Sequence, residues 1–324
     1  MNTFPVTRSI LNAKELGDYI ISQYDLDNST GCSLFRTGMN HTYMLTGNST
    51  KHVLRLYCHN WRTKQEIEEE ISLLLSLKEK GLNISYPVPD ANGNYIQEIN
   101  APEGIRYAVV FSFAEGGKVR FIDEDTCFYI GTIMGKFHQA TKSKTYKRIN
   151  YNTQTLTELP YQYANTYFHD DLPEMQYLKA LGKDIKQLFE QTLLEQGVVH
   201  LDMWYDNMAI TNENEVTVFD FDFFGNGPLI LDVAYFCKHL FIIEPNKEVH
   251  SKKAKAFING YQSINTLSQQ ELNIIPHAAA AVFIFYLGVQ SQRFDWSNIF
   301  LSENYLKMYV GRIQSWMEYH NKKQ

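Results

Sequence analysis

Residues 198–207 read V-V-H-L-D-M-W-Y-D-N, and the spacing of their polar side chains sets the fold that we expect. After an apolar pair, His200, Asp202 and Asn207 form the pattern His-x-Asp-x-x-x-x-Asn. Asp220 follows thirteen residues after Asn207, within V-T-V-F-D-F-D, and the polar turn T-N-E-N lies between them. This order predicts a loop, a short hairpin and a second loop that presents Asp220.

Oxygen-bearing side chains in this order are the set that phosphoryl transfer requires. A fixed carboxylate such as Asp202 can orient a substrate hydroxyl and accept its proton. The phosphate charge needs Mg²⁺, which takes oxygen ligands, and Asn207 and Asp220 can supply them. Each of these residues alone is readily explained as a turn residue. The prediction of phosphoryl transfer therefore depends on the whole constellation.

The segments H-L-D-M-W-Y-D-N and V-F-D-F-D-F-F-G-N-G-P-L-I-L-D together resemble the aminoglycoside phosphotransferase and choline kinase family. Its members are small-molecule kinases with a protein-kinase-like fold. The resemblance implies Asp202 as the catalytic base, and Asn207 and Asp220 as Mg²⁺ ligands. It also implies that Asp232, in the tail G-P-x-x-x-D, supports the catalytic loop, as His200 is expected to do.

Three residues of the motif region leave choices open. Leu201 stands where Gly is most common in the family, and Trp204 stands where protein kinases usually carry Lys. Trp204 favours the small-molecule branch. Asp222, the second acid of D-F-D, lies on the same face as Asp220 if the segment is extended. Asp222 is then a second metal or substrate ligand, or only a turn carboxylate.

The first third of the chain predicts a small antiparallel sheet with one inserted helix. The expected elements are a lead helix over 11–24, strands over 33–36, 42–45, 52–57, 95–99 and 107–113, and a helix over 63–80. Thr63 and Glu66 have the spacing of a capping box at the start of that helix.

The resemblance places nucleotide-binding residues on this sheet. The first hairpin turn corresponds to the loop over the phosphates of ATP, and Gly38 and Asn40 fit it. Arg55, in H-V-L-R-L-Y, stands where protein kinases use Lys and where choline kinases and some relatives use Arg; a guanidinium grips phosphate oxygens with two donors. Glu70 of the inserted helix is expected to pair with Arg55, and Glu69 is the alternative.

The segment S-F-A-E-G-G, about 112–117, corresponds to the hinge of the kinase fold. Adenine is expected to hydrogen-bond to the backbone near Ser112, Phe113 and Ala114. The chain beyond it reads as helical, with helices over 123–142, 173–195, 233–243, 251–264, 268–290 (broken near Pro276) and 304–321.

Three further features of this helical part carry expectations. Gly131 and Gly135 permit close packing of the first helix against another helix. Residues 150–172 are polar and aromatic with weak periodicity, which fits a mobile insert over the substrate. Gln290, Arg293, Phe294 and Trp296 could line a ligand pocket, or equally belong to core and rim.

The composition of the chain argues against some classes of binding partner and indicates its cellular setting. The net charge of −6 and the pI of about 5.9 argue against nucleic acid or an anionic membrane as main partner. Four scattered cysteines, without a C-x-x-C pair, indicate reduced thiols of a cytoplasmic protein. The N-terminal residues lack the apolar segment of a signal peptide. The longest apolar run, 278–289, is shorter than the roughly 20 residues that span a bilayer, and predicts a buried helix.

We therefore expect an α+β, protein-kinase-like fold of two lobes. The nucleotide-binding lobe covers about 1–113, and the helical catalytic lobe covers 118–324. The expected activity is ATP-dependent phosphorylation of a hydroxyl on an amino alcohol, an amino acid such as homoserine, or an aminoglycoside-type molecule, by a monomer or homodimer. A stress-response-type Ser/Thr protein kinase of the same fold, or a nucleotide-binding pseudokinase, remains the alternative.

Overall fold

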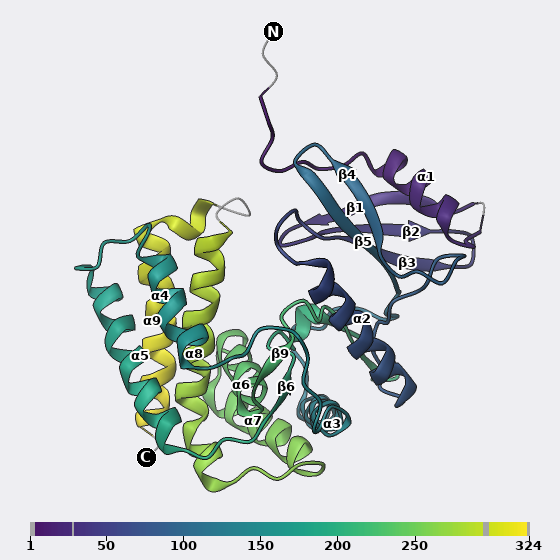
Figure 1. The fold of residues 1–324 in the computed structure, drawn as a ribbon. Helices are drawn as coiled ribbons and strands as arrows, with labels where there is room; N and C mark the ends of the chain where they lie inside the picture. Colours follow the sequence, from purple (N-terminus) through teal and green to yellow (C-terminus); the bar gives the residue numbers. More distant parts are fainter. Residues whose placement is uncertain (1–3, 28, 294–297, 323–324) are drawn as a thin grey trace. The chain divides into compact units, whose positions relative to one another are not determined.

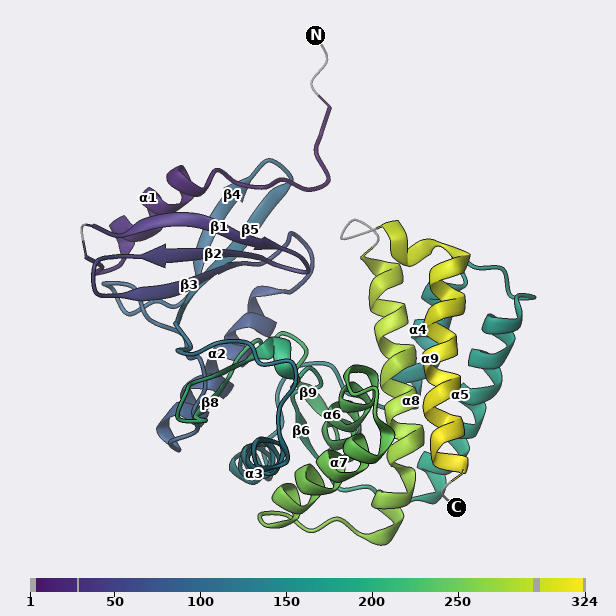
Figure 2. The same cartoon turned by 180° about the vertical axis from the view of Figure 1, so that it is seen from behind.

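The computed structural model describes residues 4–27, 29–293 and 298–322. The chain divides into two compact units. The first comprises residues 1–115 with 217–219, and the second comprises 116–216 with 220–324. An antiparallel sheet dominates the first unit and helices dominate the second, as Figures 1 and 2 show. The predicted α+β fold class is confirmed.

The first unit contains the predicted five-stranded sheet. Its strands are β1 (Gly31–Thr37), β2 (His41–Thr46), β3 (Lys51–Leu56), β4 (Gln97–Ala101) and β5 (Gly104–Ser112). The spatial order is β1-β2-β3-β5-β4, and every neighbouring pair is antiparallel. Consecutive strands therefore pair except where the inserted helix separates β3 from β4.

Helix α1 (Ala13–Gln23) covers one face of this sheet (Figure 1). The Asn12 side chain accepts hydrogen bonds from two backbone amides of the first turn and so caps the helix. The helical stripe Leu16, Ile20 and Tyr24 is buried against alternate residues of three strands, as period-two strands require. Those strand residues are Tyr43, Leu45, Leu54, Leu56, Ala108 and Val110.

Helix α2 (Lys64–Glu79) contacts the other face of the sheet. Its N-terminus shows the predicted capping box, in which the Thr63 side chain accepts from the Glu66 amide and the Glu66 side chain accepts from Thr63. Arg55 lies between the inward-facing Leu54 and Leu56 on β3, so it points away from α1. The same alternation brings Arg55 to Glu70 of α2.

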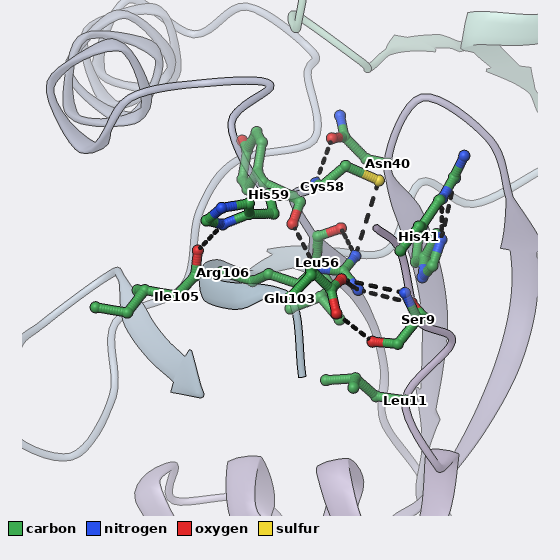
Figure 3. Close-up of polar contacts among 12 residues, drawn as sticks. Ser9, Leu11, Asn40, His41, Leu56, Cys58, His59, Glu103, Ile105 and Arg106 are labelled. Atoms are coloured by element: carbon green, nitrogen blue, oxygen red, sulfur yellow. Dashed lines mark hydrogen bonds and ion pairs between the residues drawn. The ribbon is translucent and has the colours of Figure 1, made fainter. Parts of the chain in front are cut away.

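A buried arginine ties the N-terminal segment to the sheet (Figure 3). Arg106 is 1% exposed and donates to the carbonyl oxygens of Tyr57 at 2.8 Å, Ser9 at 3.0 Å and Leu56 at 3.3 Å. The carboxylate of Glu103 lies 3.5 Å from the guanidinium and accepts from the Ser9 hydroxyl at 2.6 Å. These hydrogen bonds and the nearby carboxylate compensate for the lost hydration of the Arg106 guanidinium, so its charge can remain buried.

The second unit contains the remaining helices and three short strands. Its elements are α3 (Glu124–Ala140), a π-helical turn (Gln154–Glu158), α4 (Leu159–Ala164), α5 (Pro173–Gln191), β6 (Gln196–Val199), β7 (Met208–Ile210), β9 (Gly225–Pro228), α6 (Ile230–Ile243), α7 (Lys247–Gln262), α8 (Gln269–Gln292) and α9 (Glu303–Asn321). Strand β8 (Val216–Val218) begins in this unit and ends in the first. Strands β6 and β9 pair antiparallel, from Gln196 with Pro228 to Val199 with Gly225.

Glycines set the close approach of α3 and α7, which lie side by side in Figures 1 and 2. A Cβ added to Gly131 would lie 2.1 Å from the Phe257 carbonyl oxygen. One added to Gly260 would lie 1.9 Å from the Phe128 carbonyl oxygen, and one added to Gly135 would lie 2.8 Å from Ile264 Cβ. The prediction of close packing through Gly131 and Gly135 is confirmed.

The structure bears on two expectations for the helical unit. Residues 150–172, expected as a mobile insert over the substrate, contain the π-helical turn and α4, which pack on α8 and bury Leu156, Pro160 and Phe168. Helix α8 is not broken at Pro276. Its packing on both sides outweighs the single missing backbone donor, and Trp316 Nε1 donates to the Pro276 carbonyl oxygen at 2.9 Å.

The long helix α8 forms the centre of this unit. Its apolar run at 278–289 is buried, as predicted, apart from the partly exposed Tyr286. Of the part of the chain that the structure describes, α8 alone is long and apolar enough to cross a membrane by length and composition, and 78% of its apolar window is buried inside the protein. That burial is expected of a central core helix. Phe294 and Trp296, proposed as pocket residues, lie outside the described residues.

Candidate active site

The loop that follows β6 is held by a carboxylate at the start of α6. Asp232 is 1% exposed; its Oδ2 accepts from the His200 amide at 2.8 Å and its Oδ1 from the Leu201 amide at 2.6 Å. Leu201 has φ of 61°, a left-handed conformation that a side chain disfavours. This conformation gives a physical reason for the glycine that is common here, and the two hydrogen bonds help Leu201 to adopt it.

The same carboxylate joins the loop to α3 and α7. His138 Nε2 lies 2.9 Å from Asp232 Oδ2, and His138 Nδ1 lies 2.8 Å from the hydroxyl of Tyr261. His138 and Asp232 are both almost fully buried. Neither partner of His138 can be identified from sequence spacing, because each lies more than 90 residues away.

Asp202 is oriented from several sides within this loop. Its amide donates to His200 Nδ1 at 3.1 Å. Asn207 Nδ2 donates to Asp202 Oδ2 at 2.7 Å and to the Asp202 carbonyl oxygen at 3.0 Å. The hydroxyl of Tyr235, on α6, donates to Oδ1. Both carboxylate oxygens are thus fixed by hydrogen bonds, and three of the predicted site residues are brought together.

The surroundings of Asp202 also change its acidity. Burial, and after it the negative charge of Asp220, raise the pKa of the Asp202 carboxyl to about 7. Hydrogen bonds from Tyr235 and Asn207 oppose the rise, because they stabilise the charged form. A carboxylate with this pKa accepts a proton more readily near neutral pH than an exposed one does.

The two acids of D-F-D do not lie in an extended strand, which was the condition under which they were expected to share one face. Asp220 has φ of 64°, which interrupts the extended backbone after β8, and its side chain is partly exposed. Asp222 lies in a turn and is 2% exposed, and its carbonyl oxygen accepts from Arg148. The left-handed conformation of Asp220 ends the extended segment, and Asp220 is the more exposed of the two acids.

The acidic and amide oxygens near Asp202 fit a hard cation bound partly by other ligands. No group of three or more His, Cys, Asp or Glu side chains suited to a metal ion exists within residues 4–27, 29–293 and 298–322. Mg²⁺ commonly takes one or two carboxylates and completes its shell with water and phosphate oxygens. Asp220 and Asn207 match that donor set, and a cation there would offset the repulsion between Asp202 and Asp220.

Sequence reasoning missed Tyr235 and Tyr286, which both contact this loop. Tyr235 bonds Asp202, and the Tyr286 hydroxyl donates to the Leu201 carbonyl oxygen at 3.1 Å. Tyr235 follows Asp232 by one helical turn, so the helical period could have placed it on the loop-facing side of α6. Tyr286 comes from α8, 85 residues from Leu201, and no local pattern identifies it.

In the first unit, the structure pairs Arg55 with Glu70 rather than with Glu69. Arg55 Nη1 lies 2.9 Å from Glu70 Oε1, and the Tyr57 hydroxyl donates to Glu70 Oε2 at 2.9 Å. Glu70 is fully buried, and the guanidinium lies 5.0 Å from the ring centroid of Phe111. Such contacts from carboxylate and ring fix the direction of the Arg55 side chain.

The turn residues proposed for phosphate binding are held by hydrogen bonds from other parts of the first unit. The Gly38 carbonyl oxygen accepts from Arg8, and Asn40 Oδ1 accepts from the Cys58 amide at 3.3 Å, a bond drawn in Figure 3. The turn between β1 and β2 is therefore tied to the end of β3.

In the segment proposed for adenine binding, the backbone groups of Ser112 already form hydrogen bonds within the protein. The Ser112 amide donates to the Tyr86 carbonyl oxygen at 2.8 Å, and the Ser112 carbonyl oxygen accepts from the Ser85 hydroxyl at 2.7 Å. Both backbone groups of Ser112 are therefore used within the sheet unit. Phe113 and Ala114 follow β5 and are partly exposed.

The family model described as the phosphotransferase enzyme family matches residues 32–266, which include the loop of Asp202, Asp220, Asp232 and the pair Arg55–Glu70. The chain belongs to this family. Membership confirms the resemblance, the protein-kinase-like fold class and the assignment as a kinase or phosphotransferase.

Relatives of this phosphotransferase act on different small molecules. The homoserine kinase of Bradyrhizobium diazoefficiens is 26% identical over 289 residues, which cover 89% of this chain and 86% of that protein. Among solved structures, the amicoumacin kinase hAmiN, in complex with AMP-PNP, Ca²⁺ and Ami, has a TM-score of 0.78 at 21% identity, covering 95% of this chain and 94% of its own. The microcompartment-associated aminopropanol kinase has a TM-score of 0.75 at 17% identity, covering 95% and 96%.

Proposed function

We propose that this phosphotransferase transfers the γ-phosphoryl group of ATP to a hydroxyl of a small molecule. The acceptor oxygen forms the new bond to phosphorus, the bond to the bridging oxygen breaks, and ADP leaves with that electron pair. The acceptor proton passes to an oxygen of Asp202. The names of the relatives favour small hydroxyl compounds as acceptors, and the four free cysteines are compatible with the proposed cytoplasmic setting.

The observation that carries this proposal is the way Asp202 is held. Asn207 and Tyr235 each fix one of its carboxylate oxygens, and Asp232 holds the loop backbone beside it. Orientation of a proton acceptor is worth much in phosphoryl transfer, where positioning and electrostatics supply most of the rate. A carboxylate that served only to cap a turn would not need partners from two elements.

In this proposal Asn207 and Asp220 bind Mg²⁺ through their side-chain oxygens. Bound Mg²⁺ would neutralise phosphate charge and hold the phosphates in line for transfer. Asn207 suits the dual role, because its Nδ2 contacts Asp202 while its Oδ1 is the atom that a cation takes. Asp222, buried in its turn, is assigned a structural role instead.

The first unit is proposed to bind the nucleotide. Arg55, oriented by Glu70, would contact phosphate oxygens, and amides of the turn at Gly38 and Asn40 would line the phosphates. The adenine contact is assigned to the backbone of Phe113 and Ala114, because the Ser112 backbone groups already have partners. Domain assignments follow: nucleotide binding for about 1–113 and catalysis for 118–324.

The test is an acceptor-dependent ADP-release assay with the Asp202→Asn protein as comparison. Asp202→Asn should lower kcat by at least about 100-fold, because the proton acceptor is lost, while Mg²⁺–ATP affinity changes little. Glu213→Gln, which alters an exposed carboxylate in the following turn, is the matched control and should retain full activity. Retained turnover in Asp202→Asn would exclude Asp202 as the base. Nucleotide binding without turnover of any acceptor would favour the pseudokinase, and label on polypeptide would favour the protein kinase.

A further inference from the structure

A buried lysine lies beside the candidate catalytic loop and has no part in the chemistry proposed so far. Lys238, on α6, is 3% exposed, and it lies one turn beyond Tyr235, the residue that bonds Asp202. Burial of an ammonium is costly unless other groups compensate for its lost hydration. The contacts of Lys238 therefore need an explanation.

Its partners leave much of the ammonium's hydrogen-bonding capacity unused. Lys238 Nζ lies 2.9 Å from His239 Nε2, and the charge sits 4.3 Å from the ring centroid of Tyr235 and 4.5 Å from that of Phe283. Within the described ranges of the chain, no carboxylate lies within 4.0 Å of Lys238 Nζ. An ammonium has three N–H donors, and the imidazole accepts one of them.

These residues form one cluster with Asp202. We define the Lys238 cluster as Lys238, His239, Tyr235, Tyr286 and Trp204. The His239 ring centroid lies 4.6 Å from that of Trp204 and 4.5 Å from that of Tyr235, and the Tyr235 and Tyr286 centroids lie 5.9 Å apart. Trp204, His239 and Tyr286 are partly exposed and form the solvent-facing side of the cluster, whereas Lys238 and Tyr235 are buried behind them.

The charge within the cluster decides which solutes suit it. Aromatic rings alone would suit a cationic acceptor. Here the ammonium of Lys238 already lies against those rings, so a second cation would be repelled. An anion would instead gain ammonium donors and an ion pair in a poorly hydrated setting. Burial lowers the pKa of Lys238 to about 7, because the desolvated ammonium is unfavourable, and an anionic ligand would stabilise the charged form.

We infer that the Lys238 cluster recognises the acceptor, and that it selects a hydroxyl compound that carries a carboxylate. Lys238 would bind the carboxylate while Asp202, linked to the cluster by Tyr235, receives the hydroxyl proton. Carboxylate binding by Lys238 stands by itself, whereas proton transfer to Asp202 rests on the proposed function. It makes Lys238 a specificity-determining residue and disfavours purely cationic acceptors such as amino alcohols and aminoglycosides.

A pair of acceptors that differ only in the carboxylate tests this inference. L-Homoserine and 3-amino-1-propanol share the hydroxyl, the carbon spacing and the amine. Their binding to the full chain with an ATP analogue and Mg²⁺ is measured by calorimetry, and their turnover by ADP release. Lys238→Met keeps a similar stem without the charge. Lys247→Met is the control, because Lys247, the first residue of α7, also lies over an aromatic ring, 3.7 Å from the Phe241 centroid.

The inference predicts that L-homoserine binds the unaltered protein at least ~30-fold more tightly than 3-amino-1-propanol, as a desolvated charge pair allows. Lys238→Met should abolish that preference and leave nucleotide affinity unchanged, whereas Lys247→Met should keep it. Equal binding of the two compounds, or a preference that survives Lys238→Met, would overturn the inference. A preference that depends on Lys238 without turnover would refute the proposed function alone. If Lys238→Met does not fold, Lys238→Gln replaces it.

Discussion

At the scale of single residues, the catalytic loop of the second unit depends on two side chains of α6 that hydrogen-bond to it. Asp232 bonds the backbone amides of His200 and Leu201 and the ring of His138, so one carboxylate sets the shape of the loop that carries Asp202. Tyr235 then fixes the carboxylate of Asp202 itself. Both act by positioning, and both come from one turn of α6.

The first prediction concerns the pair Arg55–Glu70. Glu70→Ala should raise KM for ATP about 10-fold with a smaller effect on kcat, because the Arg55 guanidinium loses the partner that orients it. It should also destabilise the sheet unit, since Tyr57 loses its hydrogen-bond acceptor. Steady-state kinetics and urea unfolding measure the two effects. Glu69→Ala is the matched control and should change neither; equal effects of the two substitutions would contradict the assignment.

The second prediction follows from the lowered pKa of Lys238, about 7 against the usual 10.5. Between these values the unfolded chain binds more protons than the folded one, so this group makes stability rise with pH. Around the ammonium lie Asp202 from the loop, Tyr235 and His239 from α6, and Tyr286 from α8; only Asp202 raises the pKa of Lys238.

Lys238→Met should therefore increase the free energy of unfolding near pH 7, by on the order of 2 kcal/mol. The gain should shrink as the pH approaches 10, where the unfolded lysine also loses its proton. Urea unfolding of both proteins over this pH range measures the difference. A loss of stability in Lys238→Met that does not vary with pH would mean that the lysine is compensated in the folded protein.

At the scale of elements, close helix contacts depend on glycine where a carbonyl of the partner helix faces it. Gly260 of α7 meets the Phe128 carbonyl of α3, and Gly131 of α3 meets the Phe257 carbonyl of α7. These reciprocal contacts hold α3, which carries His138, against α7, which carries Tyr261. The hydrogen bond between those two residues, and so the support of Asp232, depends on that distance.

The third prediction compares two glycines in helices. Gly260→Ala should destabilise the protein by roughly 2 kcal/mol or more, because its Cβ would lie 1.9 Å from a backbone oxygen and the helices must separate. Gly311→Ala, in α9, should stabilise it by up to ~1 kcal/mol, since nothing lies within 4 Å and alanine favours helix. Thermal and urea unfolding measure both. A neutral Gly260→Ala would show that α3 and α7 can separate without cost.

At the scale of the whole molecule, ligand binding should be visible as stability. A ligand that binds only the folded state raises the free energy of unfolding, by about 2.7 kcal/mol at a hundred times its Kd. The fourth prediction is that Mg²⁺–ATP raises Tm more than ATP alone does, and that Asp220→Ala removes the increment due to Mg²⁺. Thermal denaturation with and without Mg²⁺ measures it. An increment that persists in Asp220→Ala would assign the cation to other ligands.

Local features of this chain are readable without its structure. Periodicity reveals features that depend on neighbours a few residues away. These are the helical stripe of Leu16, Ile20 and Tyr24, the capping box at Thr63 and the alternation along β3. The spacing of His200, Asp202 and Asn207 likewise identifies the loop chemistry, because those residues meet within one turn of chain.

Tertiary packing determined the remaining features of the fold and the site. It brings together residues that are far apart in the sequence, and no sequence pattern predicts their contact. Residues 150–172 look irregular, yet they become helical against α8, where burial compensates for their weak periodicity. The bonds of His138 to Tyr261 and of Tyr286 to Leu201 span 123 and 85 residues. From the sequence, Lys238 is an ordinary charged residue of a helix. In the fold, aromatic rings surround it, and it becomes a buried cation beside Asp202.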